Sequence, residues 1–343
     1  MGGHDRMTRM WKVLPLLVLL AALPLLAAKP MSIYFIDVEG GQCTLIVSPS
    51  GQSLLVDTGW PGLQGRDADR IVKTAKKAGL KRIDHLLITH FHSDHVGGIT
   101  QLTERFPVVN FIVHGKNTET GKGAGNLQEA WDRAAAKGTT TIVKAGDSVP
   151  LKGLDIKIVS ARGELLAQPL AGAGGENPLC ASAVRKDPDP SENARSVGFV
   201  LTYGKFRFVD LGDLTWNKET DLVCPVDKLG KVDVLLATHH GSSQSNPPAL
   251  VNSLAPRVIV MNNGAKKGGD PSSWKIFKAS PGLEDLWQLH FAVAAAKEAN
   301  VEDPYIANLQ SPGGGNLLLS VEPTGRFRLL NFRNKFEKVY NAR

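Results

Sequence analysis

The stretch Leu86–Gly98 reads LLITHFHSDHVGG, and it places three of the nine histidines and an aspartate within six positions. The apolar run before the histidines predicts a buried strand, in which residues i and i+2 face the same way. His90 and His92 can therefore point at one spot beyond the strand, whereas Asp94 and His95 can reach a second spot beside it. Two adjacent sites of this composition suit a pair of zinc ions or similar metals. The glycine pair that closes the stretch is expected to let the backbone turn sharply away.

Two later strands also end in residues that can bind a metal. FVDLGDLT places Asp213 after a strand and a glycine, and VDVLLATHHGSSQS places His239 and His240 after another strand. A dinuclear site needs a bridging carboxylate and a closing histidine, and these positions supply both. We expect Asp213 rather than Asp210 to approach the metals, because Gly212 leaves room for close contact.

The rest of the chain has the pattern of an α/β protein. Helices are expected at 66–78, 98–105 and 126–137, with apolar or alternating strands before, between and after them. The strands form two groups, one on each side of the middle of the chain, and a hairpin at 316–332 closes the sequence. This alternation indicates a layered α/β fold.

Two long segments interrupt the pattern. Residues 162–193 are rich in Gly, Pro, Ala and Asp and have no periodicity, so we expect a loop or insertion there. Residues 265–312 form a second such segment, for which we expect a helix around 282–300. Both lie within a single predicted domain at 30–343.

The first 28 residues are typical of a secretory signal peptide. Three basic residues precede a short apolar run from Val13 to Ala28, which two prolines interrupt. The protein is therefore expected to be periplasmic or secreted, with no stable membrane partner beyond this segment. The alternative is an uncleaved membrane anchor.

Cysteine content and charge fit an exported protein without identifying its substrate. Cys180 and Cys224 can form one disulfide that leaves Cys43 free in a strand, although three unpaired thiols fit the sequence equally well. The formal net charge of +7 permits attraction to an anionic substrate and does not require one.

Several motifs together resemble one large family. FIDVEGGQCTLI, LLVDTG, THFHSDHVGG, LGD and THHGSSQS look like the metallo-β-lactamase superfamily, and within it the ComEC-like metallohydrolase domains and bacterial phosphorylcholine esterases. The motifs span residues 32 to 260 or so. The resemblance implies a four-layer αββα sandwich, with two sheets face to face between outer helices.

The resemblance also implies roles for particular residues. His90 and His92 would bind the first metal, and Asp213 would bridge to a second metal held by Asp94, His95 and one histidine of the His239–His240 pair. Two zinc ions are expected.

Further roles concern the residues around the ligands. Asp57 of the VDTG motif would orient a ligand histidine. Either histidine of the later pair could be the ligand. We favour His240, and expect His239 to donate to the substrate and Asp94 to orient the nucleophile, which makes Asp94 and His239 the expected catalytic residues.

One feature departs from the pattern of lactamases, lactonases and glyoxalases. These enzymes use a third histidine on the first metal, and between His95 and Asp213 this chain has only His114. His114 ends a strand, so it could be a ligand or could simply support a loop. The departure favours the ComEC-like branch.

The expected function is an exported dinuclear zinc hydrolase that cleaves phosphodiesters through a metal-bridging hydroxide. A lactamase- or lactonase-type amide or ester hydrolase is the first alternative, and a binding module without bound metal is the second. The expected partner is a small-molecule or phosphodiester substrate. Nucleic acid has no independent support, because the chain has no basic-aromatic stripe.

Overall fold

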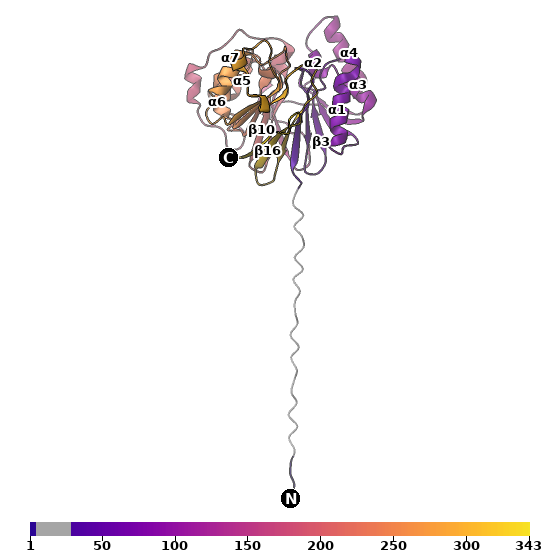
Figure 1. The fold of residues 1–343 in the computed structure, drawn as a ribbon, viewed down its shortest axis with the longest axis vertical. Helices are drawn as coiled ribbons and strands as arrows, with labels where there is room; N and C mark the ends of the chain where they lie inside the picture. Colours follow the sequence, from indigo (N-terminus) through magenta and orange to yellow (C-terminus); the bar gives the residue numbers. More distant parts are fainter. Residues whose placement is uncertain (5–28) are drawn as a thin grey trace.

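Two sheets lie face to face between two sets of helices in the computed structural model, which describes residues 1–4 and 29–343 (Figure 1). This is the four-layer arrangement that the resemblance implies. The predicted signal peptide falls largely on residues 5–28, outside the described residues. No helix within the described part of the chain is long and apolar enough to cross a membrane.

The first sheet has the strand order β17-β16-β15-β1-β2-β3-β4-β5-β6. Its strands are β1 (Met31–Phe35), β2 (Thr44–Val47), β3 (Ser53–Val56), β4 (Ile83–Leu87), β5 (Val108–Val113), β6 (Thr139–Ile142), β15 (Leu317–Val321), β16 (Arg326–Asn331) and β17 (Glu337–Asn341). The hairpin predicted at 316–332 is present as β15 and β16. It returns to the N-terminal half, because β15 pairs with β1 antiparallel.

The second sheet has the order β14-β13-β12-β11-β10-β9-β7-β8. Its strands are β7 (Asp155–Ala161), β8 (Glu164–Leu165), β9 (Gly198–Tyr203), β10 (Phe206–Asp210), β11 (Val234–Leu236), β12 (Val258–Met261), β13 (Asp285–His290) and β14 (Ile306–Asn308). Apolar side chains from the inner faces of both sheets, such as Phe35 and Phe208, form the central core.

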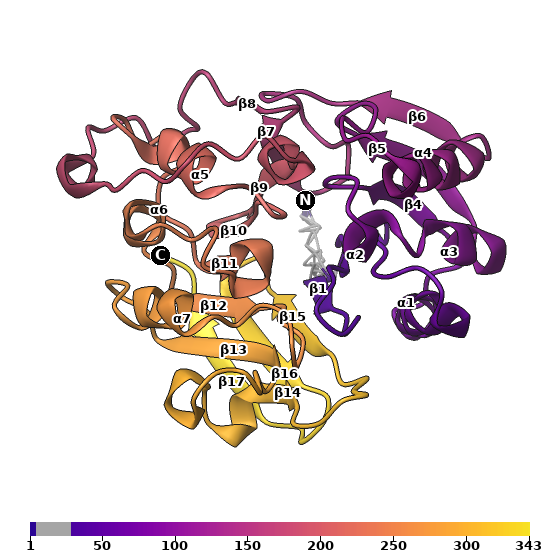
Figure 2. The same cartoon turned by 90° about the horizontal axis from the view of Figure 1, so that it is seen from above.

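Helices cover the outer face of each sheet (Figure 2). α1 (Arg66–Lys77), α3 (Ile99–Arg105) and α4 (Lys122–Ala135) pack on the first sheet, and α5 (Trp216–Val223), α6 (Pro248–Leu254) and α7 (Pro271–Lys278) pack on the second. The three helices predicted in the N-terminal half are confirmed within a few residues at each end. In α1, Ala68, Ile71 and Ala75 repeat at helical spacing and are buried, which docks this helix on the sheet.

The helix expected around 282–300 is wrong. Residues 285–290 form β13, which pairs in parallel with β12. Trp287 and Leu289 face the central core, whereas Leu286 faces the core beneath the outer helices. This alternation between two apolar cores favours a strand buried on both faces. The helix of this segment is α7, which lies nearer its beginning.

Segment 162–193 is largely irregular, as its composition predicts. It contains the two-residue strand β8 and a short 3-10 helix at Pro178–Ser182, and a further 3-10 helix follows at Glu192–Arg195. A disulfide joins Cys180 to Cys224, and Cys43 is free and buried. Of the two alternatives that the sequence leaves open, the structure therefore has the disulfide.

Candidate metal centre

The predicted ligands leave their strands at one edge of the two sheets. β4 runs parallel to β3, and β10 runs parallel to β11. The carboxyl ends of each pair therefore lie at the same edge of their sheet, where the loops after these strands begin. The chain after β4 carries His90 and then α2 (Ser93–Val96), which contains Asp94 and His95. The loop after β10 carries Asp213, and the loop after β11 carries His239 and His240.

Four of these side chains form a compact group, which we call the ligand cluster: Asp94, His95, Asp213 and His240. One ligand atom from each lies within 4.8 Å of those of the others. His95 Nε2 is 3.2 Å from both Asp94 Oδ2 and Asp213 Oδ2. His240 Nε2 is 3.2 Å from Asp94 Oδ2 and 3.4 Å from Asp213 Oδ2. Both halves of the chain therefore contribute to one cluster.

The other predicted residues surround this cluster. His90 Nε2 lies 4.0 Å from Asp213 Oδ2, and the His90 ring centre is 4.1 Å from that of His95. His239 Nε2 lies 3.4 Å from Asp213 Oδ2, with part of its side chain exposed. The His92 ring centre is 4.6 Å from that of His90, but its Nε2 faces Glu119 Oε1 at 3.1 Å.

Burial and charge in the cluster fit a bound cation. The Nε2 atoms of His90, His95 and His240 are buried, and none has a hydrogen-bond partner among the described residues. Burial opposes the charged form of His95, but the carboxylates of Asp213 and Asp94 outweigh it and raise the pKa of His95 well above its usual value. The cluster thus combines two carboxylates, which favour positive charge, with imidazole nitrogens that have no hydrogen-bond partner among the described residues. Carboxylate oxygens and imidazole nitrogens are a suitable donor set for zinc.

Sequence comparison points to the same family. A family model described as the metallo-beta-lactamase superfamily matches residues 36–163, which contain the HFHSDH motif. This part of the chain belongs to the metallo-β-lactamase superfamily. Its curated relatives include ComE operon protein 3 of Bacillus subtilis (26% identical over 192 residues, 56% of this chain and 21% of the relative). They also include Recombination protein 2 of Haemophilus influenzae (25% identical over 230 residues, 67% and 24%).

Similarity to these two relatives makes the chain ComEC-like. The chain spans less than a quarter of the length of either relative. Among solved structures, the metallo-beta-lactamase fold protein YhfI from Bacillus subtilis matches with a TM-score of 0.46 and 13% identity, covering 76% of this chain and 96% of that one. A diphosphatase from the PhnP family matches with a TM-score of 0.36 and 13% identity, covering 68% and 87%.

Asp57 holds the imidazole of His95 in a fixed orientation. Its Oδ2 lies 2.7 Å from His95 Nδ1, and the same oxygen accepts a hydrogen bond from the Thr89 hydroxyl at 2.7 Å. Asp57 Oδ1 accepts from the Thr89 N–H at 2.8 Å. With Nδ1 bound in this way, His95 presents Nε2 to the cluster.

Glycines allow the close backbone contacts around the site. A Cβ on Gly212, whose φ is +58°, would lie 3.0 Å from Thr89 Cβ, so a glycine lets the chain before Asp213 pack against Thr89. Gly97 and Gly98 form the turn between α2 and α3 with ordinary helical φ values, so neither glycine is needed there for a left-handed conformation. They are needed for contact instead, because a Cβ on Gly98 would lie 2.2 Å from the Thr58 carbonyl oxygen.

Asp210, the rival of Asp213, lies outside the cluster. Both of its carboxylate oxygens accept hydrogen bonds from the Gln42 amide, at 2.9 and 3.1 Å, and Oδ1 also accepts from the Gly212 N–H. Burial raises the pKa of Asp210 to about 7. Asp210 therefore ties Gln42 to the end of β10 and does not face the imidazoles of the cluster.

His114 is turned toward a residue that the sequence did not single out. Its Nε2 lies 3.0 Å from Glu192 Oε2, and both side chains are buried. The same oxygen accepts from the Phe91 N–H at 3.1 Å, between the two histidines of the HxH motif. Thr118 donates to Glu192 Oε1 through its N–H and its hydroxyl. His114 and Glu192 thus brace the histidine loop.

Asn246 and Glu219 hold the His239–His240 turn, and no sequence motif indicates either role. Both histidines have positive φ, +54° and +56°. This left-handed backbone conformation costs free energy, so contacts with surrounding residues must hold it in place. Asn246 Oδ1 accepts from the Thr238 N–H at 3.1 Å, and its Nδ2 donates to the Thr238 carbonyl at 2.9 Å. The Asn246 N–H in turn donates to the buried Glu219 carboxylate at 2.6 Å.

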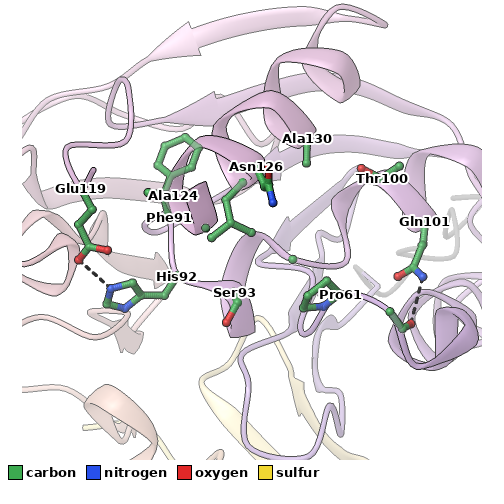
Figure 3. A pocket seen from close by; sticks show the side chains of 14 residues that line it. Pro61, Phe91, His92, Ser93, Thr100, Gln101, Glu119, Ala124, Asn126 and Ala130 are labelled. Atoms are coloured by element: carbon green, nitrogen blue, oxygen red, sulfur yellow. Dashed lines mark hydrogen bonds and ion pairs between the residues drawn. The ribbon is translucent and has the colours of Figure 1, made fainter. Parts of the chain in front are cut away.

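A groove of about 700 Å³ opens beside His92, between α2, α3 and α4 (Figure 3). Phe91, Leu127 and Ala130 give it an apolar wall, and Glu119 closes the end next to His92. No lysine or arginine is among the described residues that line it. The groove can therefore hold an uncharged organic group next to the histidine loop.

Proposed function

We propose that this superfamily member is an exported phosphodiesterase that uses two zinc ions. One observation carries the proposal: two buried carboxylates converge with buried imidazole nitrogens that find no hydrogen-bond partner in the described chain. Those imidazoles come from both halves of the chain, so the fold itself assembles the donor set.

The donors divide naturally between two ions. In the proposal His90 and His92 hold the first ion, His95 and His240 hold the second with Asp94, and Asp213 bridges. The position of Asp213 supports the bridging role, because its Oδ2 is within 3.2 to 4.0 Å of the Nε2 atoms of His95, His239, His240 and His90. His92 would need only to turn from Glu119, since its ring already lies beside that of His90.

The chemistry follows from this arrangement. Two zinc ions at the cluster would lower the pKa of a shared water, so that hydroxide forms near neutral pH. Asp94 faces the same space as Asp213 and is suited to orient the attacking oxygen. His239 is partly exposed beside Asp213 and is suited to donate to the substrate oxygen that gains charge.

The choice of a phosphodiester rests on two observations. His114 pairs with Glu192, which argues against the third histidine ligand that lactamases and lactonases use. The groove beside His92 can take the uncharged organic group of an ester. The ComEC-like relatives are consistent with this choice but do not identify a substrate.

Export is supported by the Cys180–Cys224 disulfide, because disulfides persist mainly in oxidising compartments. We propose that residues 1–28 direct the chain out of the cytoplasm. Recovery of the native protein from the periplasm or medium, without these residues, would agree with this proposal. Retention of the intact segment in the membrane fraction would contradict it.

The reaction is tested on the purified zinc form with two reporters, bis-p-nitrophenyl phosphate and the lactam nitrocefin. We expect hydrolysis of the phosphodiester and little or none of the lactam. Hydrolysis of nitrocefin alone would replace the proposal with lactamase chemistry. A purified chain without bound metal would support a binding module instead.

A further inference from the structure

Lys267 brings an ammonium group to the rim of the ligand cluster. Its Nζ contacts Asp94 Oδ2, and it lies 5.0 Å from the centre of the Trp60 ring. The side chain is 34% exposed, so the charge faces solvent as well as the carboxylate. A lysine in this position can reach both the cluster and a molecule that enters from outside.

The loop that carries Lys267 is fixed from two sides. The Gly264 N–H donates to the Lys267 carbonyl at 2.8 Å, which closes a tight turn. The Gly269 N–H donates to the His240 carbonyl at 2.9 Å, which ties the loop to the histidine turn. Asp270 adds a further tie, because its Oδ2 accepts from the Ser243 N–H at 2.7 Å.

Glycines let this loop pack against the site. A Cβ on Gly268, whose φ is +70°, would lie 2.2 Å from the His240 carbonyl oxygen. A Cβ on Gly264 would lie 2.7 Å from the Glu39 carbonyl oxygen on the other side. The loop with the sequence NNGAKKGGD therefore packs closely between the His240 turn and the Glu39 turn. This packing fixes the backbone that carries Lys267.

Trp60 restrains the ammonium further. The distance of 5.0 Å between Lys267 Nζ and the ring centre permits a cation–π attraction. The backbone N–H of Trp60 donates to Asp67 Oδ2 at 2.9 Å, which ties this part of the loop to α1. The ring thus limits how far the lysine can swing from the cluster.

Neighbouring cations are occupied elsewhere. Arg66 is paired with Asp67, and Arg70 is paired with Asp37 and Glu39. The residues described around the groove include no lysine or arginine. Lys267 therefore supplies the positive side chain that a negatively charged substrate would meet at the rim of the cluster.

We infer that Lys267 binds a negatively charged oxygen of the substrate and so makes the site selective for anionic esters over neutral ones. This inference rests on the proposed function for the identity of the ester. The geometry, a rigid lysine beside Asp94 and open to solvent, carries it. A charge-assisted hydrogen bond of this kind holds a phosphate oxygen in place without taking part in bond cleavage.

The test uses the zinc-loaded full chain and two matched variants, K267M and K266M. Lys266 is exposed and adjacent, so K266M makes the same change in net charge away from the site. Zinc content, thermal unfolding, the Kd for inorganic phosphate, and kcat and KM for bis-p-nitrophenyl phosphate and for neutral p-nitrophenyl acetate are measured for each protein.

K267M should weaken phosphate binding and raise KM for the phosphodiester about ten-fold or more, as expected for the loss of one hydrogen bond to a charged group. Zinc content and the kinetics on the neutral ester should stay within about two-fold of the parent by the same reasoning. K267R should retain most of the phosphate affinity. It also serves as the informative variant if K267M does not fold.

Equal phosphate affinity in the parent, K267M and K266M would overturn the inference, as would a parent that binds no phosphate. A loss of zinc in K267M with unchanged phosphate affinity would also overturn it, because Lys267 would then only support Asp94. If the parent cleaves no phosphodiester but its phosphate binding still depends on Lys267, the proposed function fails and the inference stands.

Discussion

His240 Nε2 lies 3.2 Å from Asp94 Oδ2, although the two residues belong to opposite halves of the chain and follow strands of different sheets. The contact exists because the ends of β4 and β11 open at the same edge of the sandwich. A ligand cluster that spans two sheets depends on the packing between them. A substitution in the ligand cluster must therefore be tested for metal binding or activity and, separately, for its effect on folding.

Replacing Asp213 with alanine should abolish turnover, with a loss in kcat of about 1,000-fold or more, because the carboxylate is shared by the ligand positions. The protein should remain folded by circular dichroism, since none of the three apolar cores of the described residues includes this side chain. D221A is the control, because Asp221 is an exposed aspartate paired with Arg185 on the surface. Turnover close to that of the parent in D213A would remove Asp213 from the site.

Replacing Asp57 with asparagine should weaken zinc binding about 10- to 100-fold, because Asp57 orients His95 through Nδ1. Asparagine tolerates the left-handed φ of +61° at this position, so the backbone is preserved. Competition with a zinc chelator measures the affinity. D67N is the control, because Asp67 is a buried carboxylate that accepts a hydrogen bond from the Trp60 backbone N–H and not from an imidazole. An equal loss of zinc affinity in both variants would argue against an orienting role for Asp57.

Replacing His114 with glutamine should leave the zinc content unchanged, because His114 bonds to Glu192. The amide can still donate to Glu192, so activity should stay within about five-fold of the parent. Elemental analysis and the phosphodiester assay check both statements. Loss of one zinc ion in H114Q would make His114 a ligand and would favour lactamase-type chemistry.

Glu219 should make stability depend on pH. Burial raises the pKa of its carboxyl from 4.5 to about 8, so the folded state favours the protonated form. The stability this group contributes is therefore fully present below pH 4.5 and is lost as the pH rises through about 8.

E219Q keeps an acceptor for the Asn246 N–H without the charge. The melting temperature of E219Q relative to the parent should therefore increase by about 3 °C or more between pH 5 and pH 8.5 or so. Calorimetry of both proteins across this range checks the prediction. Parallel melting curves at every pH would show that Glu219 does not titrate in the window.

Removing the disulfide should lower stability. C224S opens a link between residues 44 positions apart, and such a loss costs about 2–4 kcal/mol. Denaturant unfolding measures the difference. The denatured, unreduced parent should expose a single reactive thiol, Cys43, and three reactive thiols would contradict the disulfide.

The sequence predicts much of this site because the ligand chemistry is local. His90, His92, Asp94 and His95 lie within one strand-to-helix turn, so their proximity follows from the local sequence. Asp213 follows a strand and a glycine, which is likewise a local pattern. These features need no knowledge of which strands pair.

What the sequence did not predict depends on tertiary contacts. Glu192 lies in an irregular segment without a motif, and only folding brings it to His114 and the Phe91 N–H. Asn246 gains its role only once its loop packs on the histidine turn. The sequence does not predict strand β13, because a short apolar run buried on both faces has no clear periodicity.

The measurement that tests the metal centre most directly is the zinc content of the purified chain and of D213A by elemental mass spectrometry. The proposed ligand set predicts about two zinc ions per chain in the parent and a clear loss in D213A. A parent protein that retains almost no metal after zinc reconstitution, or equal metal content in both proteins, would contradict a metal centre built on Asp213.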